Sequence, residues 1–365
     1  MFQKLTLKSV RVRPLVVPLS RPVIARIMRF DTFPIIAIDL QTEEGIVGRS
    51  YLEPYVTSSM RAIVPVIEDL CKAHIGKPLA PLDNYQGFRR ALNFVGLEGI
   101  SLIAVAGLDM AIWDALAQAA GMPLSVFLGG SLAPVPAYSS GGMWLSDVKS
   151  LGREAQELVA EGGFKGLKVR LGRDRMADDA EAIRVTREAI GEDTKLMIDF
   201  NQALSLGDAL DRCHALDDLG LCWFEEPIAY NNLAGYAQLT RELDTPVQLG
   251  ENFYGPRALY EALRVGAGDY YMPDLMRIGG VSGWLRSVPV AAAAGIQVSS
   301  HLYPEFSAHM LRVTETAHWL EWQDYANPIL QRPFEVKDGF VHIPDVPGSG
   351  VSWNEEAIKR FRYEG

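Results

Sequence analysis

From about residue 133 onward, the sequence repeats one unit, a short apolar segment with a polar or acidic end followed by a segment of helical period. Eight units within roughly 190 residues are typical of a parallel β/α barrel. The expected strands are residues 135–138, 166–171, 195–201, 222–227, 247–252, 270–274, 296–301 and 319–321, with helices such as 178–190 and 206–219 between them. A doubly wound open sheet is the alternative, but no Gly-rich phosphate-binding fingerprint follows the first strand.

The residues before this repeat follow a different order, strands first and helices after. Segments 5–12 and 34–40 alternate like strands, and Thr42–Gly45 is a candidate hairpin turn. Apolar residues recur with helical spacing from residue 58 to 118. We therefore expect an α+β domain over residues 1–130, the barrel over residues 131–330, and a C-terminal segment over residues 331–365 whose hairpin at 334–343 returns to the first domain.

A loop expected at residues 21–32 mixes apolar residues with cations. Val23, Ile27 and Phe30 either form an apolar flap over a site or pack on their own domain, and the sequence does not decide between the two. The cations in the same loop are Arg26 and Arg29. Together with Gln323, beyond Glu321, they would suit substrate hydroxyls or a second carboxylate.

Composition excludes several classes of function. The formal net charge of -10 disfavours nucleic acid and anionic membranes as partners. Cys71, Cys213 and Cys222 show neither metal spacing nor a disulfide framework, which indicates a reducing, cytoplasmic compartment. Residues 1–7 lack the pattern of a cleaved leader, and the apolar stretch at residues 288–294 is too short to span a bilayer.

The expected strand at residues 166–171 places two cations on one face. Side chains two apart on a strand share a face, so Lys168 and Arg170 point the same way. Two inward cations are costly unless anions lie nearby. A solvated strand face is the simpler interpretation of this motif alone, and the strands that follow argue against it.

The following strands end in acidic residues. In a β/α barrel, functional groups lie at the carboxyl ends of the strands. Asp199, Glu225 and Glu251 occupy those ends on three consecutive strands, and three converging carboxylates repel one another unless a divalent cation binds. Oxygen ligands alone suit Mg²⁺. Glu226 would face away from Glu225, and a structural ion-pair network is the alternative.

The next two strands end in Asp274 and His301. Neighbouring strands bring these side chains within reach, so that the carboxylate fixes the imidazole tautomer and leaves the other nitrogen as a base. The final expected strand ends in Glu321.

Several runs in the second half of the chain resemble motifs of the mandelate racemase branch of the enolase superfamily, and the resemblance covers essentially the whole chain. These runs are residues 272–274 (MPD), 278–281 (IGGV), 299–302 (SSHL), 317–321 (AHWLE) and 343–348 (IPDVPG).

The resemblance implies a capping domain over a modified (β/α)8 barrel and Mg²⁺ held by the three carboxylates. It implies removal of the proton α to a substrate carboxylate through an enediolate, with His301 as base. Lys168 would lie beside one carboxylate oxygen, and a protonated Glu321 would donate to the other. Asn201 would contact the region of the α-hydroxyl, and Leu302 would be a further substrate contact. The partner would be a small carboxylate, and the protein a homo-oligomer.

One position departs from that family pattern. Racemases of this kind carry a K-x-K pair, whose second lysine is a base, whereas this chain has Arg170. A guanidinium is effectively always protonated and is a poor base. This favours dehydration of an acid sugar or hydroxy diacid, which needs one base. A mandelate racemase-like racemase or epimerase and a non-catalytic binding protein on the same barrel are the alternatives.

Overall fold

A computed structural model describes residues 4–364. Met1, Phe2 and Gln3, the start of the segment without a leader pattern, lie outside the described residues. The amino-terminal part is a three-stranded antiparallel sheet followed by helices, as the sequence predicted. Its elements are Leu7–Ala25 (β1), Met28–Thr42 (β2), Val47–Leu52 (β3), Thr57–Lys72 (α1), Pro81–Ala91 (α2), Ile100–Ala119 (α3) and Leu124–Phe127 (α4).

The remaining elements form the barrel and the C-terminal segment. The strands are Val135–Ser139 (β4), Gly166–Arg170 (β5), Lys195–Asp199 (β6), Phe224–Glu225 (β7), Val247–Leu249 (β8), Tyr270–Tyr271 (β9), Gln297–Val298 (β10), Leu320–Trp322 (β11), Glu335–Lys337 (β12) and Phe340–His342 (β13). The helices are Val148–Gly162 (α5), Met176–Ile190 (α6), Leu206–Leu216 (α7), Leu233–Glu242 (α8), Gly255–Val265 (α9), Leu275–Ile278 (α10), Gly280–Ala293 (α11), Pro304–Leu311 (α12), the 3-10 turn Asn327–Ile329 (η1) and Glu355–Arg360 (α13).

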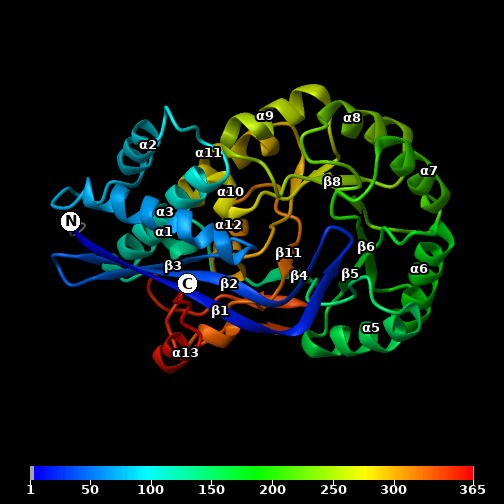
Figure 1. Ribbon diagram of the computed structural model, residues 1–365, viewed down its shortest axis with the longest axis horizontal. Coiled ribbons are helices and arrows are strands. Elements are labelled where there is room, and N and C mark those ends of the chain that lie inside the picture. Colours follow the sequence, from blue (N-terminus) through cyan, green and yellow to red (C-terminus); the bar gives the residue numbers. More distant parts are fainter. Residues whose placement is uncertain (1–3, 365) are drawn as a thin grey trace.

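The eight strands β4 to β11 form a closed parallel barrel. Consecutive strands from β4 to β10 pair in parallel, and β11 pairs with β4. The backbone N–H groups of His318 and Ser300 join the segments of β10 and β11, donating to Val298 and Trp319 carbonyl oxygens at 2.9 Å each. In Figure 1, helices α5 to α9 curve around the outside of the strands. The expected barrel is therefore confirmed, and the carboxyl ends of its strands meet at one mouth.

The segment expected to be a loop at residues 21–32 is instead the tip of a long hairpin. β1 and β2 stay paired up to Ala25 and Met28, with a register shift between Pro18 and Val23. Figure 1 shows this hairpin, in blue, extending from the amino-terminal sheet toward β4 and β5. The reason is that alternating apolar residues continue through the tip and can form a strand ladder.

Three contacts fasten the hairpin tip to the barrel. The Leu145 N–H donates to the Ile24 carbonyl oxygen at 2.9 Å. The Arg26 guanidinium donates to the Gly172 carbonyl oxygen at 2.9 Å, and Arg21 pairs with Glu161 at 2.5 Å. The tip is thus held against the loops after β4 and β5 and against α5.

The hairpin of the C-terminal segment corrects one expectation. β13 pairs antiparallel with β4 and so extends the barrel sheet instead of the first domain. The chain beyond it does return to β1 and β2. The Trp353 indole donates to Asp39 Oδ1 at 2.7 Å, and Arg13 pairs with Glu355 at 2.8 Å. Figure 1 accordingly places the C-terminus beside β1.

Helix α3 is the centre of the amino-terminal domain and is buried on nearly all sides. By length and composition it is the one described helix that could cross a membrane, although 83% of its most apolar 18-residue stretch is buried within the protein. A helix that is apolar all round is typical of a core helix. It packs against α10 and α11 of the barrel, where a Cβ at Gly280 would lie 2.6 Å from Asp109 Oδ2.

Asp109, on α3, is a buried carboxyl group at the amino end of α11. Its Oδ2 accepts the Ser282 N–H at 2.8 Å, while Oδ1 has no partner. Burial raises the pKa of Asp109 to about 7. Between the unfolded pKa, near 3.9, and this folded value the native state keeps a proton that the unfolded chain loses. The contribution to stability is therefore complete below pH 4 and is lost as pH rises through 7.

We expect Asp109→Asn to flatten this loss of stability, because asparagine accepts the same N–H without titrating. The effect should reach at most roughly 4 kcal/mol between pH 4 and 8. Urea unfolding across that pH range measures it. Asp69→Asn, at an exposed position of α1, is the control and should leave the change of unfolding free energy with pH as it is in wild type. If the unfolding free energy of Asp109→Asn fell with pH as steeply as that of wild type, the raised pKa of Asp109 would not be its cause.

Candidate active site

A cavity of about 270 Å³ opens between the barrel mouth and the hairpin tip. Its polar side carries side chains from the strand ends, and its other side is apolar. Of the residues singled out in the sequence, those lining it are Lys168, Arg170, Asp199, Asn201, Glu251, His301, Leu302, Glu321, Gln323, Val23, Ile27 and Phe30. The strand-end residues thus come together across about 150 positions of sequence, and Val23, Ile27 and Phe30 form a cover over them.

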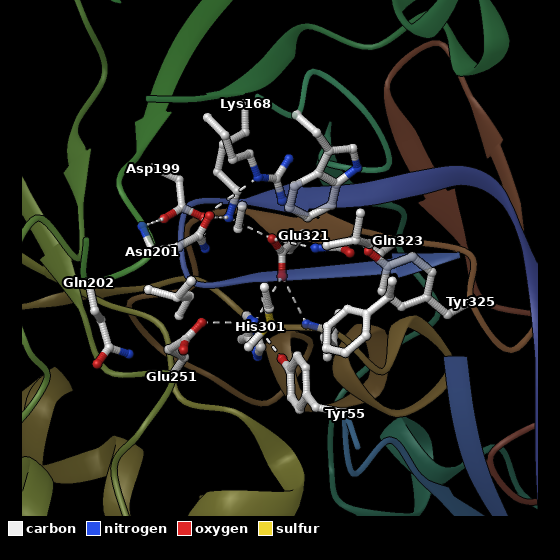
Figure 2. Close-up of a pocket in the computed structure, with 18 of the residues that line it drawn as sticks. Tyr55, Lys168, Asp199, Asn201, Gln202, Glu251, His301, Glu321, Gln323 and Tyr325 are labelled. Atoms are coloured by element: carbon white, nitrogen blue, oxygen red, sulfur yellow. Dashed lines mark hydrogen bonds and ion pairs between the residues drawn. The ribbon is translucent and has the colours of Figure 1, made fainter. Parts of the chain in front are cut away.

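Lys168 lies at the centre of the polar side and contacts three carboxylates. Its Nζ is 2.5 Å from Glu225 Oε1, 2.7 Å from Glu321 Oε1 and 3.2 Å from Asp199 Oδ2. Burial opposes the charge of this ammonium group, but the carboxylates outweigh burial and hold the pKa of Lys168 well above its ordinary value. Figure 2 shows Lys168 and Glu321 pointing toward each other across the site.

Asp274 and His301 form the expected pair. His301 Nδ1 lies 2.7 Å from Asp274 Oδ2, while Asp274 Oδ1 caps α10 by accepting the Met276 and Arg277 N–H groups. His301 Nε2 faces Glu251 Oε2 at 3.1 Å and Tyr55 Oη at 3.5 Å. Burial lowers the pKa of His301, but the surrounding carboxylates outweigh it and raise that pKa well above the ordinary value. Because Asp274 holds Nδ1, the orientation of the imidazole ring is fixed from the side opposite the cavity.

Glu321 accepts hydrogen bonds and donates none in this structure. Its oxygens accept from Lys168 Nζ, from Ser140 Oγ at 2.8 Å, from Gln323 Nε2 at 3.0 Å and from the Leu302 N–H at 3.0 Å. Burial acts to raise the pKa of Glu321, but Lys168 and His301 outweigh burial and lower it. The sequence-based expectation of a protonated donor is thus not met, because four donors converge on this carboxylate.

The Arg170 guanidinium is bound by the loop after β4. Nη1 donates to the carbonyl oxygens of Ser140 at 2.8 Å and Gly142 at 3.0 Å, and Nη2 donates to Ser140 Oγ at 2.7 Å. The plane of the guanidinium stacks on Trp144, with Cζ 3.8 Å from the ring centroid. Nε has no hydrogen-bond partner and lies 3.8 Å from Asp199 Oδ2. Arg170 therefore contributes fixed positive charge beside the acidic cluster.

The expected metal ligands lie at one mouth but do not form a closed ligand set. Within residues 4–364, no three His, Cys, Asp or Glu side chains already enclose a site for a metal ion. Asp199 and Glu225 share Lys168, whereas the Glu251 carboxylate turns to His301 and to Arg277, whose Nη1 is 3.4 Å away. Three carboxylates on adjacent strands still match the oxygen donors that Mg²⁺ prefers. The donor set fits Mg²⁺, with the Glu251 side chain redirected.

Two expected substrate contacts are absent from the cavity lining. Arg26 is occupied by the Gly172 carbonyl oxygen, and Arg29 pairs with Asp31 at 3.2 Å on the exposed side of the hairpin. In a strand, alternate side chains face opposite ways, and the tip presents Val23, Ile27 and Phe30 to the cavity. A second substrate carboxylate would find no partner in Arg26 or Arg29.

Three barrel strands, β6, β7 and β10, are followed by left-handed backbone, and after β6 and β10 the residues in this conformation line the cavity. Asn201 and Gln202 after β6 have φ of 47° and 62°, and Leu302 after β10 has φ of 52°. Asn201 Nδ2 donates to Asp199 Oδ2 at 3.0 Å. Glu226 has φ of 37°, so it does not simply face away from Glu225, and its Oε2 accepts from Gln202 at 2.6 Å. Such conformations are uncommon without glycine and gather at functional sites.

Sequence reasoning missed several residues of the site. They are Ser140, which links Arg170 to Glu321, and the cavity-lining Tyr55, Trp144, Gln202, Asn252, Arg277, Tyr325 and Phe33. Ser140 and Gln202 had a signal, since each is polar and lies within three residues of the end of a barrel strand. Tyr55 and Trp144 had none, because only the docking of the loop between β3 and α1 and of the loop after β4 brings them to the mouth.

Comparison with known proteins places both parts of the chain in related families. Residues 8–129 match the N-terminal domain of mandelate racemase / muconate lactonizing enzyme, and residues 150–357 match the enolase C-terminal domain-like family. The chain is 30% identical to arabinonate dehydratase of Saccharolobus solfataricus over 345 residues, which is 90% of each chain. Other curated relatives are named as cycloisomerases, epimerases and racemases.

Two solved structures are particularly similar. An enolase from the alpha proteobacterium BAL199 with bound magnesium is 52% identical, with a TM-score of 0.97 over 98% of this chain and 100% of that one. An enolase from Bradyrhizobium complexed with magnesium and mandelic acid is 39% identical, with a TM-score of 0.95 over 100% of both chains.

Proposed function

The chain belongs to the mandelate racemase and muconate lactonizing enzyme family of the enolase superfamily, and on this premise we propose that it dehydrates a 2,3-dihydroxy monocarboxylic acid in a Mg²⁺-dependent reaction. It is an enzyme of the lyase or isomerase type, which removes the non-catalytic alternative. The observation that carries dehydration is the environment of Arg170, whose terminal nitrogens are bound by Ser140 and Gly142. Among residues 4–364, His301 is then the residue to which we assign the base.

The residues divide the reaction between them. Lys168 binds a substrate carboxylate oxygen, and Asn201 contacts the substrate near its α-hydroxyl group. Mg²⁺ held by Asp199, Glu225 and Glu251 would stabilise negative charge on the carboxylate as the α-proton leaves. With the Glu251 carboxylate turned from Nε2 toward Mg²⁺, the strongest influence that keeps His301 protonated would be removed. His301 Nε2 then takes the α-proton while the C–H electron pair moves into the enediolate. The enediolate then forms a Cα–Cβ double bond, the β-hydroxyl leaves with the proton from His301 as water, and the enol tautomerises to a 2-keto acid.

The lining of the cavity supports a monocarboxylic substrate over a diacid. Arg26 and Arg29 are directed elsewhere, and Arg277 donates to the backbone carbonyl oxygen of Glu251 at 3.1 Å, a contact that redirection of the Glu251 side chain does not remove. The far side of the cavity is formed by apolar and aromatic side chains, namely Val23, Ala25, Ile27, Met28, Phe30, Phe33, Trp144 and Tyr325. An apolar wall leaves hydroxyl groups without partners, so a short or apolar distal group fits it better than a long polyol.

The same apolar wall favours a second candidate, a racemase of an aromatic 2-hydroxy acid. The Bradyrhizobium structure holds mandelic acid, which is such a compound. Racemisation needs a base on each face of the α-carbon. The two candidates therefore differ in one measurable outcome, the stereochemistry of proton exchange.

Incubation of substrates in D₂O tests the proposal. A panel of 2,3-dihydroxy acids and aryl 2-hydroxy acids is followed by NMR, with Mg²⁺ and with excess EDTA. We expect deuterium to enter from the His301 face only, one α-epimer to react, 2-keto acid to form, and EDTA to stop the reaction. Interconversion of two enantiomers at enzymatic rates would establish the racemase instead.

Arg170→Lys should add exchange from the opposite face, because a buried lysine beside another cation can reach a useful pKa whereas a guanidinium does not. We expect at least about a ten-fold gain in that exchange over wild type, in line with the range for a positioned general base. Arg173→Lys, at the ion pair with Asp179 on the following loop, is the control and should gain nothing. No gain in Arg170→Lys would mean that this position cannot reach the α-carbon.

We also propose a cytoplasmic homo-oligomer. Cys71, Cys213 and Cys222 are all free, which supports a reducing compartment. Phe94 and Val95, in the loop after α2, are 103% and 79% exposed and offer an apolar contact for a second copy. Light scattering of the purified protein tests the oligomer.

A further inference from the structure

One carboxylate oxygen of Glu225 accepts hydrogen bonds from two donors that are buried inside the barrel. The Trp223 indole Nε1 donates to Glu225 Oε2 at 3.0 Å, and Gln248 Nε2 donates to the same oxygen at 3.2 Å. Both donor residues are 0% exposed. Hydrogen bonds to an ionised acceptor are stronger than those between neutral groups. Oε2 is therefore firmly directed into the barrel interior and away from the cavity.

The strand register explains this arrangement. Trp223 lies two residues before Glu225 and so points to the same, inward face. Gln248 of β8 is the direct partner of Glu225 of β7 in the parallel ladder. The Gln248 amide also contacts Met272 Sδ at 3.3 Å. An amide turned the other way would press its carbonyl oxygen against the carboxylate, so the donor orientation is required.

The other oxygen, Oε1, is the one presented to the site, where Lys168 Nζ contacts it at 2.5 Å. A carboxylate with one oxygen fixed by two donors can offer a cation only the other. We propose that Trp223 and Gln248 are positioning residues that restrict Glu225 to a single-oxygen contact and thereby favour Mg²⁺ over Ca²⁺. This inference rests on the magnesium site of the proposed function.

The two cations differ in what they require of a carboxylate. Mg²⁺ is small, demands near-octahedral geometry and takes one oxygen from each carboxylate, whereas Ca²⁺ accepts more ligands and often binds both oxygens of a carboxylate. Releasing Oε2 would permit two-oxygen contact and loosen the fixed position of Oε1. Loss of either donor should thus weaken Mg²⁺ binding more than Ca²⁺ binding.

Calorimetric titration of EDTA-treated, dialysed full-length protein with MgCl₂ and, separately, CaCl₂ tests this. Trp223→Phe keeps a ring and removes the N–H, and Gln248→Met keeps the shape and removes the amide. We expect each to raise the Kd for Mg²⁺ by about 10- to 100-fold, the usual effect of losing a partner of a metal ligand. The Kd for Ca²⁺ should change less, so the preference for Mg²⁺ falls.

Trp284→Phe is the matched control, because it removes a buried indole donor, to Thr314 Oγ1 at 3.0 Å, away from the site. It should leave both Kd values unchanged. An unchanged Mg²⁺ to Ca²⁺ ratio in Gln248→Met would overturn the inference, even if Trp223→Phe fails to fold. Failure of the wild-type protein to bind Mg²⁺ would instead overturn the metal site of the proposed function.

Discussion

Replacing His301 with asparagine is expected to slow deuterium exchange at the substrate α-carbon by about 10³-fold or more, within the range for loss of a general base or above it. The ring is held by Asp274 at 2.7 Å with its second nitrogen directed into the site. Asparagine has a similar shape but cannot accept a proton near neutral pH. The terminal nitrogens of Arg170 are bound by backbone and hydroxyl oxygens, so that residue offers no substitute base.

The rate of deuterium exchange by Asp274→Asn should lie between the rates of wild type and His301→Asn. The imidazole ring stays in place in this variant, but its tautomer is no longer fixed. His342→Asn, at an exposed position of β13, is the control and should exchange at the wild-type rate. Exchange by His301→Asn at a rate near wild type would place the base elsewhere.

Lys168→Met is expected to have two large and separable effects. Removing the ammonium leaves Asp199, Glu225 and Glu321 buried without their shared cation, which should destabilise the metal-free protein by about 3–5 kcal/mol. Turnover should fall by about 10²- to 10³-fold, because the substrate carboxylate loses a positive donor. Unfolding in EDTA and steady-state kinetics with Mg²⁺ measure the two effects.

Added Mg²⁺ should recover much of the stability of Lys168→Met but not its turnover, since a divalent cation can neutralise the carboxylates without replacing the donor. Lys165→Met, at the exposed position three residues earlier, is the matched control. Equal stability of Lys168→Met and wild type in EDTA would show that these carboxylates are not charged together in the folded protein.

The sequence was sufficient to predict the barrel and the residues at its mouth. The β/α order makes the strands parallel, and parallel strands bring their carboxyl ends to one rim, so Lys168, Asp199, Glu251, His301 and Glu321 had to meet. The period of two within a strand likewise placed Lys168 and Arg170 on one face. These inferences depend on local pattern and chain order alone.

Only the tertiary structure decided what each long side chain contacts. Arg26 and Arg29 were expected in a loop over a site, but they lie in a hairpin tip, where one donates to Gly172 and the other pairs with Asp31. Arg170 is bound by Ser140 and Gly142, about 30 residues earlier in the chain. Long charged side chains have many rotamers of similar energy, and the partner that selects among them comes from another part of the chain.

The state of the acidic cluster was also beyond the sequence. Glu321 was expected as a protonated donor, but Lys168, Ser140, Gln323 and the Leu302 N–H all donate to it. The charge of a buried carboxyl depends on how many donors reach it and how far it is from water, and both are set by packing. Sequence therefore determined which groups meet at the mouth of this barrel, and packing determined which of them hold protons and which side chains face the cavity.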